Sequence, residues 1–212
     1  MIISHKYKCI FIRIPKCLST SVEDFFTELD PNCMSSKDHP QQHGHETSSQ
    51  VKKMVANDEW NSYFKFTFFR NPEKRFISQY VDHLNYSFPK NNPNHIRLNW
   101  LLTENSSLNN SKDKVIKKHD FMQFQTFNRW WNIPGFTYQQ IDWHDKNLDF
   151  IGNMDKIKRD WDFIKEKLNI ETSLKLPHSN TTNSKEWKLD YDSKLLLNIF
   201  YKEDLEFYDK LK

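Results

Sequence analysis

The stretch from Lys8 to Phe26 (KCIFIRIPKCLSTSVEDFF) constrains the fold most, because it reads as a strand, a tight turn and a helix in direct succession. Its first half is an apolar, partly β-branched run, which is typical of a buried strand. Pro15 cannot donate a hydrogen bond to a central strand ladder, so the strand should stop there. Apolar residues then recur at helical spacing as far as Leu29. The pattern predicts a strand whose carboxyl end leads into a helix N-terminus.

The predicted turn combines a lysine with hydroxyl side chains. Lys16 precedes a group of three hydroxyl residues, Ser19, Thr20 and Ser21. If Thr20 is the N-cap, Glu23 stands where the partner of a capping box belongs. A helix N-terminus carries N–H groups without helical partners and a partial positive charge, so it attracts anions. The turn is therefore a candidate phosphate or sulfate cradle, and an ordinary strand-to-helix connection with a surface lysine is the alternative.

The same arrangement occurs a second time. Residues 63–69 (YFKFTFF) predict a strand, and Asn71 followed by Pro72 is a good N-cap and first residue for a helix reaching about Tyr86. Arg70 stands at the strand end, between the two elements.

The basic residues of this second segment could meet at one anion. Arg75 and Ser78 are three residues apart and share one side of the predicted helix, close to Arg70 in the chain. Open α/β sheets bind ligands at the carboxyl ends of parallel strands. A capped helix with surface arginines is the alternative interpretation.

Further elements follow the same alternation. The patterns predict a short helix over 49–58, an aromatic helix over 121–131, a strand over 148–152 followed by an amphipathic helix, and a long helix over 191–211. Strands separated by helices indicate an α/β layer fold with a parallel sheet. The length fits a single domain, 1–212. Its polar stretch 87–118, with a short helix over 95–102, is predicted to be a loop, a lid or an acceptor-facing insertion.

Composition removes several function classes. The chain has three glycines, so it cannot build a Walker A loop or a Rossmann GxGxxG turn. A net charge of +3 does not indicate nucleic-acid binding. Three cysteines without a CxxC pair favour a reducing compartment. No signal-peptide pattern or membrane-length apolar run is visible, so we expect a cytoplasmic protein without a membrane span.

A histidine cluster follows the first helix. His43, Gly44 and His45 stand beside Glu46 in a polar stretch. Histidine titrates near neutrality and suits general-base work, and a solvated loop histidine is the alternative. The two histidines lack a convincing third ligand, so no metal site is expected.

Several segments resemble one enzyme family. IFIRIPKCLSTSVEDFF is similar to the 5′-phosphosulfate-binding segment of sulfotransferases that use 3′-phosphoadenosine-5′-phosphosulfate (PAPS), and FKFTFFRNPEKRFISQY is similar to their 3′-phosphate-binding segment. LDFIGNMDKIKRDWDFI, LPHSNTT and YKEDLEFYDKL resemble later segments, in the same order. The resemblance is to the carbohydrate-type, Golgi-like branch and its soluble bacterial or viral relatives. It implies a three-layer sandwich with a central parallel sheet, the P-loop-NTPase-like sulfotransferase fold.

The resemblance also implies roles for residues of the donor site. Lys16 would contact the 5′-phosphosulfate and offset charge on the bridging oxygen as the sulfuryl group leaves. The backbone and hydroxyls of the next five residues would hold the phosphate and sulfate oxygens; these residues are Cys17, Leu18, Ser19, Thr20 and Ser21. Arg70 and Ser78 would bind the 3′-phosphate.

The acceptor side follows from the same resemblance. His45 would be the catalytic base, with His43 and Glu46 as the other candidates. The reaction would move the sulfuryl group in line from PAPS to a hydroxyl of a small-molecule or carbohydrate acceptor, without a metal. The sequence specifies neither the acceptor nor an oligomeric state.

The chain departs from the family pattern at two places. Cys17, Leu18 and Ser19 stand where the family often has Thr-Gly-Gly, which predicts a stiffer turn that can donate backbone N–H groups if it avoids positive φ. Asn153 stands where the family often has arginine. Two alternatives therefore stay open: a phosphonucleotide-binding protein without catalysis, and a small-molecule kinase with an atypical phosphate loop. The chain shows no obvious pair of acidic residues for Mg²⁺, which counts against the kinase alternative.

Overall fold

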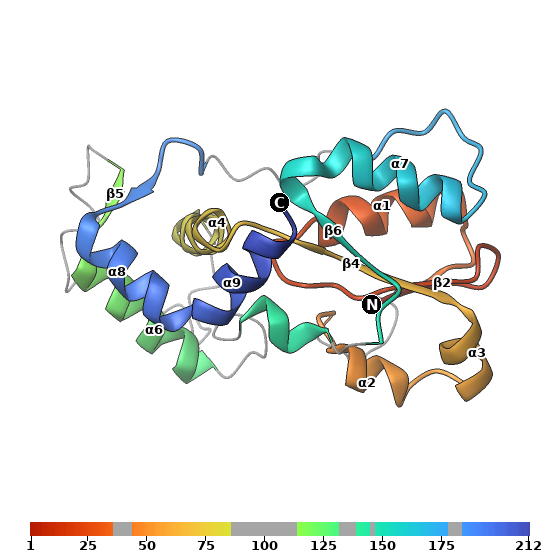
Figure 1. The fold of residues 1–212 in the computed structure, drawn as a ribbon, viewed down its shortest axis with the longest axis horizontal. Coiled ribbons are helices and arrows are strands. Elements are labelled where there is room, and N and C mark those ends of the chain that lie inside the picture. Colours follow the sequence, from red (N-terminus) through yellow and green to blue (C-terminus); the bar gives the residue numbers. More distant parts are fainter. Residues whose placement is uncertain (36–43, 86–113, 132–138, 145–146, 178–183) are drawn as a thin grey trace. The chain divides into compact units, whose positions relative to one another are not determined.

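The structure, a computed structural model, describes residues 1–35, 44–85, 114–131, 139–144, 147–177 and 184–212 (Figure 1). The chain divides into two compact units, which are described separately below. The first unit comprises residues 1–71, 139–181 and 203–212, and the second comprises residues 72–138 and 182–202.

A mixed sheet forms the centre of the first unit. Its described strands run in the order β3 (Met34–Ser35), β1 (Ile2–Ser4), β2 (Cys9–Phe11), β4 (Phe64–Phe69) and β6 (Phe150–Asn153). β2, β4 and β6 are parallel, whereas β1 pairs antiparallel with both β2 and β3. The predicted parallel sheet is confirmed for these three strands. The sequence did not predict the antiparallel strands β1 and β3.

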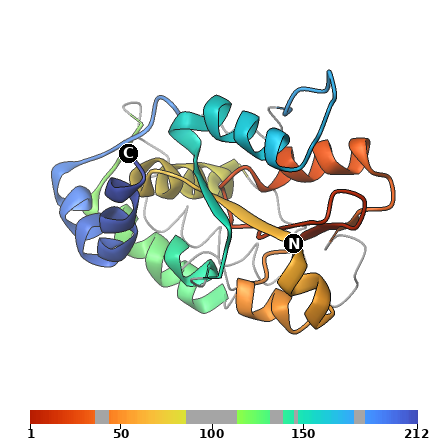
Figure 2. The ribbon, with the colours of Figure 1, turned by 45° about the vertical axis from the view of Figure 1, so that its right-hand side comes forward.

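Helices cover both faces of this sheet because its strands are apolar on both sides. On one face an aromatic cluster is covered by α1 (Ser19–Leu29) and α7 (Ile157–Lys167). On the other face an isoleucine-rich cluster is covered by α2 (Ser48–Lys52), α3 (Asn57–Ser62) and the 3₁₀ helix η2 (Gln140–Trp143). Phe11 belongs to the first cluster, and Ile10 and Ile12 to the second, as the alternation of strand side chains requires. Figure 2 shows α1 and α7 together on one side of the strands, with α2 and α3 on the other.

Gly152 of β6 gives a test of this packing. A Cβ atom there would lie 2.5 Å from Cε1 of Phe68, a ring with 0% exposure. We expect Gly152→Ala to lower the free energy of unfolding by about 1–3 kcal/mol, because a closed core has no room for the methyl group. Urea denaturation would measure this, with the exposed Ser173→Ala as control. An unchanged midpoint in Gly152→Ala would contradict the packing.

The second unit is built from helices around a small parallel sheet. It contains α4 (Pro72–Asn85), β5 (Val115–Ile116), α6 (Lys118–Trp131), β7 (Lys188–Leu189) and α8 (Tyr191–Phe200), and β5 pairs with β7. The apolar side predicted for α4 is confirmed: its residues pack with α6 and α8 in one cluster, which includes Phe76, Ile77, Tyr80, Val81, Phe121, Phe124, Leu197 and Tyr201.

Several predicted boundaries differ from the structure, among them the strand expected over 148–152, which is β6 at Phe150–Asn153. The helix expected over 49–58 is two helices, α2 and α3. The helix expected over 191–211 is also two, α8 and α9 (Lys202–Lys210). Tyr201 breaks it with φ −121°, and its hydroxyl accepts a hydrogen bond from Gln125 Nε2 at 2.8 Å. α6 begins at Lys118, three residues earlier than expected.

Some predictions fall outside the described part of the chain. Residues 86–113, which hold most of the predicted lid and the short helix over 95–102, are among them. Within the remainder of the predicted loop, β5 is a strand. Among the helices of the described residues, none is both long and apolar enough to span a membrane.

Candidate active site

The turn between β2 and α1 lies beside the end of β4 because the two strands are parallel neighbours. Their pairing continues past β2: Ile12 N donates to Phe66 O at 2.9 Å, and Thr67 Oγ1 donates to Ile12 O at 2.7 Å. The carboxyl ends of both strands therefore meet at one edge of the sheet. There the Arg70 guanidinium donates from Nη1 to the Lys16 carbonyl at 3.1 Å. The structure thus brings Arg70 of the second segment to the backbone of Lys16 in the first segment.

The turn itself adopts a backbone that glycine would adopt most readily. Lys16 has φ 64° and Leu18 has φ 62°. The turn therefore does not meet the condition, avoidance of positive φ, under which backbone donation was expected. The left-handed conformation costs about 1–2 kcal/mol for a residue with a Cβ. The Leu18 side chain offsets part of that cost because it packs against the aromatic cluster of the first unit. Its carbonyl accepts from Val22 N at 3.0 Å and starts α1.

The hydroxyl residues take different places from those predicted. Leu18, and no hydroxyl side chain, is the N-cap of α1, so the capping box with Thr20 is wrong. Ser19 Oγ instead donates to the Ile14 carbonyl at 2.6 Å and closes the turn. Ser19 and Ser21 are buried, whereas Thr20 and Lys16 are partly exposed at the turn.

Glu23 has a tertiary partner that replaces the predicted cap. Its Oε1 accepts from Arg13 Nη1 at 2.9 Å and also from Ser35 Oγ, and both members of the Arg13–Glu23 ion pair are buried. Burial lowers the pKa of Arg13, and the nearby carboxylates of Glu23 and Glu46 oppose that shift. The sequence interpretation missed Arg13; its charge within an otherwise apolar run was the available signal.

His45 is held against the same segment. Its Nδ1 lies 2.9 Å from the Arg13 carbonyl oxygen, which can only accept, so Nδ1 carries the hydrogen. In the neutral ring Nε2 then has a lone pair. Trp143 Nε1 fixes the backbone by donating to the His45 carbonyl at 3.2 Å. Burial lowers the pKa of His45 to about 4, although the Arg13 carbonyl opposes the shift, so the ring is neutral well below pH 7.

The other two base candidates differ from His45. Glu46 is buried, and its carboxylate accepts from the Met1 ammonium at 3.1 Å and from Gly44 N at 3.2 Å. Burial raises the pKa of Glu46, but the ammonium and these hydrogen bonds outweigh it and leave the pKa below its usual value. The Glu46 carboxylate therefore already accepts two hydrogen bonds. His43 lies outside the described residues.

The lowered pKa of His45 predicts a pH-dependent stability. The unfolded chain binds this proton near pH 6.5 and the folded protein only near pH 4, so stability is present above pH 6.5 and is lost as the pH falls toward 4. Between pH 7 and pH 4 we expect the free energy of unfolding to fall more in the wild type than in His45→Asn, by at most about 3 kcal/mol. Urea unfolding at both pH values measures this, and equal losses would contradict it.

The remaining predicted residues lie as follows. The buried Cys17 thiol donates to Gln140 Oε1 at 3.1 Å, and the Cys17 backbone N–H donates to the Ile14 carbonyl at 3.2 Å. Both donors of Cys17 therefore have partners within the protein. Ser78 and Arg75 are on α4 of the second unit, and both are buried. Asn153 has a structural role, because its side chain accepts from Asp155 N at 2.9 Å and its N–H donates to Asp160.

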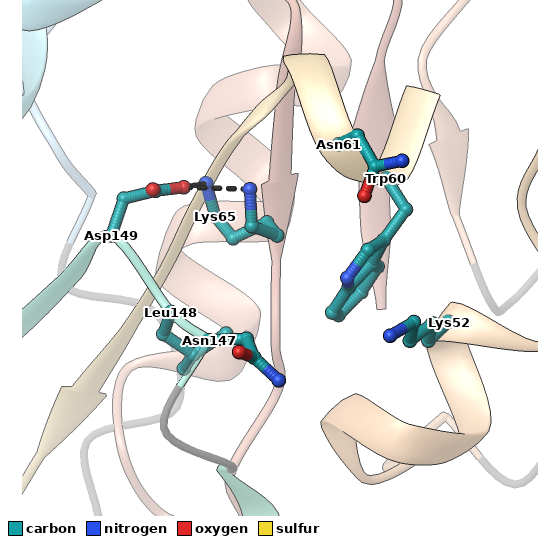
Figure 3. A pocket seen from close by; sticks show the side chains of 7 residues that line it. All are labelled: Lys52, Trp60, Asn61, Lys65, Asn147, Leu148 and Asp149. Atoms are coloured by element: carbon teal, nitrogen blue, oxygen red, sulfur yellow. Dashed lines mark hydrogen bonds and ion pairs between the residues drawn. The ribbon is translucent and has the colours of Figure 1, made fainter. Parts of the chain in front are cut away.

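A hollow of about 350 Å³ lies at the opposite edge of the sheet (Figure 3). Lys65 at the start of β4 forms an ion pair with Asp149, just before β6, at 2.8 Å, and Trp60 and Lys52 face them. Because these are the amino ends of the parallel strands, the hollow is separate from Lys16 and Arg70. Within the described residues, no group of three or more histidine, cysteine or acidic side chains is arranged to hold a metal.

Comparison with known proteins gives one finding. A family model described as "Sulfotransferase family" matches residues 1–210. The match covers both compact units and includes both strand–turn–helix segments. Neither a curated protein nor a solved structure matches the chain.

Proposed function

The chain belongs to the sulfotransferase family, whose enzymes take the sulfuryl group from PAPS, and we propose that it transfers this group to an acceptor hydroxyl with His45 as base. The observation that carries the proposal is the contact between the two basic segments, in which the Arg70 guanidinium donates to the Lys16 carbonyl at 3.1 Å. The match across both units supports a single sulfotransferase domain over 1–212.

The first segment would bind the phosphosulfate end of the donor. Lys16 is partly exposed and precedes the N-terminus of α1, the positive end of the helix dipole, which attracts anions. Backbone N–H groups at the start of α1 and the Thr20 hydroxyl would supply hydrogen bonds to phosphate and sulfate oxygens, and the helix dipole favours their negative charge.

The second segment would bind the 3′-phosphate. Arg70 follows β4 directly, and its guanidinium forms charge-assisted hydrogen bonds to phosphate oxygens. Ser78 is assigned to the same phosphate by its place in the Arg-Asn-Pro segment of the sequence. Because a 3′-phosphate distinguishes PAPS from ATP, this segment sets the choice of nucleotide.

The transfer needs positioning and charge stabilisation more than covalent chemistry. The acceptor oxygen forms a bond to sulfur, and the bond from sulfur to the bridging oxygen breaks on the opposite side. Its electron pair stays on the 5′-phosphate, where Lys16 offsets the charge. His45 Nε2 takes the acceptor proton, which its neutral ring and protonated Nδ1 allow. A carbohydrate hydroxyl is the acceptor we propose.

Incubation with ³⁵S-labelled PAPS and panels of glycans, phenols, lipids and hydroxylated small molecules tests the proposal. We expect label in at least one hydroxylated acceptor, with glycans first, and formation of 3′,5′-adenosine bisphosphate. Binding of the donor without transfer to any acceptor would indicate a phosphonucleotide-binding protein. Phosphoryl transfer from ATP would indicate the kinase instead.

A further inference from the structure

Gln140 connects the two basic segments through hydrogen bonds that use its whole side-chain amide. Its Oε1 accepts from Cys17 Sγ at 3.1 Å and from Arg70 N at 2.8 Å. Its Nε2 donates to the Arg70 carbonyl at 2.8 Å and to Asp204 Oδ2 at 3.3 Å. The opposite amide orientation would place donor against donor at Arg70 N, so the network defines the orientation. Gln140 is fully buried at 0% exposure.

Asp204 at the start of α9 anchors this glutamine. Its Oδ2 accepts from Gln140 N at 2.8 Å and its Oδ1 accepts from Ile141 N at 2.9 Å, while its own N–H donates to Gln139 Oε1 at 3.1 Å. Asp204 is also 0% exposed. A buried carboxylate that accepts several backbone N–H groups holds their positions firmly, because each lost bond would leave a charge unsatisfied.

The same short helix also reaches His45. Trp143, three residues after Gln140 in η2, donates to the His45 carbonyl at 3.2 Å. One segment thus contacts the turn that holds Lys16, the backbone of Arg70 and the backbone of the proposed base. All of these residues belong to the first unit.

We propose that Gln140, anchored by Asp204, is the positioning residue that holds the phosphosulfate turn and Arg70 in register for one donor molecule. The proposal rests on the proposed function. Gln140 would touch none of the reacting atoms, which are the acceptor oxygen, the sulfur and the bridging oxygen. It acts because displacement of either segment by about 1 Å is enough to cost a large factor in binding or rate. If Gln140 had a purely structural role, its replacement would lower the stability of the protein. The contributions of the two segments to donor binding would then not depend on Gln140.

Calorimetry with 3′,5′-adenosine bisphosphate and 5′-AMP separates these roles. In Gln140→Leu we expect affinity for the bisphosphate to fall at least about tenfold and affinity for 5′-AMP to fall by less. The relative position of the turn and Arg70 matters only for a nucleotide whose two phosphates are bound by both segments. A double-mutant cycle adds the second readout: Arg70→Ala should cost less affinity in the Gln140→Leu background than in the wild type.

The control is Gln125→Leu. Gln125 is another buried glutamine with one side-chain partner, Tyr201, in the second unit. We expect it to lose stability and keep the affinity for the bisphosphate. If Gln140→Leu does not fold, Asp204→Asn replaces it in both experiments, the comparison of the two nucleotides and the cycle with Arg70→Ala. This substitution removes the carboxylate that anchors Gln140 with little change of side-chain volume.

Folded variants with unchanged bisphosphate affinity, or with an undiminished effect of Arg70→Ala, would overturn the positioning role. Equal weakening toward both nucleotides would also overturn it. Absence of bisphosphate binding in the wild type would instead overturn the proposed function.

Discussion

His45→Asn is expected to lower kcat by about 10²–10⁴-fold, the usual contribution of a positioned general base. The asparagine amide can still donate to the Arg13 carbonyl that now holds His45 Nδ1 at 2.9 Å, so the segment should keep its position. What disappears is the lone pair of Nε2. Affinity for 3′,5′-adenosine bisphosphate should therefore stay within about twofold, which is under 0.5 kcal/mol.

The matched control is His5→Asn. His5 is an exposed histidine of the same unit whose Nδ1 lies 2.8 Å from Tyr63 Oη, and we expect its replacement to leave turnover unchanged. Initial rates with saturating labelled PAPS and an identified acceptor measure the effect. Full activity of His45→Asn would remove His45 as the base and return the role to Glu46 or His43.

Arg70→Ala should weaken binding of 3′,5′-adenosine bisphosphate by about 10–100-fold, because a hydrogen bond to a charged group contributes about 1.5–3 kcal/mol. Affinity for 5′-AMP, which lacks the 3′-phosphate, should change little. Arg70→Lys should recover part of the loss, since lysine keeps the charge without the planar donor pair. Calorimetry with the two nucleotides gives both values.

Arg159→Ala is the control for the loss of an arginine. Its side chain is 63% exposed and its Nε forms an ion pair with Asp160, so nucleotide binding should be unaffected. Unchanged bisphosphate affinity in Arg70→Ala would remove the 3′-phosphate assignment. Equal weakening toward both nucleotides would mean that Arg70 acts through the Lys16 carbonyl, to which it donates at 3.1 Å.

The elements that local chemistry specifies were predicted well. Pro72 begins α4 as its fixed φ favours, and the apolar side of α4 packs as its helical spacing indicates. The parallel arrangement of β2, β4 and β6 follows from strands that alternate with helices. The antiparallel strands β1 and β3 were missed because three and two residues are too few for a periodic signal.

The details of the candidate site depend on tertiary partners. Glu23 stands at a capping-box position, but its carboxylate forms an ion pair with Arg13 instead, because the buried guanidinium needs a charged partner. Leu18 takes a positive φ because the turn requires it and its side chain finds an apolar cluster. Gln140 carried no sequence signal, since its partners are 123 positions away at Cys17, 70 at Arg70 and 64 at Asp204.

Nucleotide selectivity distinguishes a PAPS donor site from a site for ATP. Calorimetry would compare 3′,5′-adenosine bisphosphate, ADP, and ATP with Mg²⁺ on the wild-type protein. If the two basic segments form a donor site for PAPS, the bisphosphate should bind at least about tenfold more tightly than ADP, because only it offers a phosphate to Arg70. Preference for ATP with Mg²⁺, or equal affinity for the bisphosphate and ADP, would exclude a PAPS donor site built from these two segments.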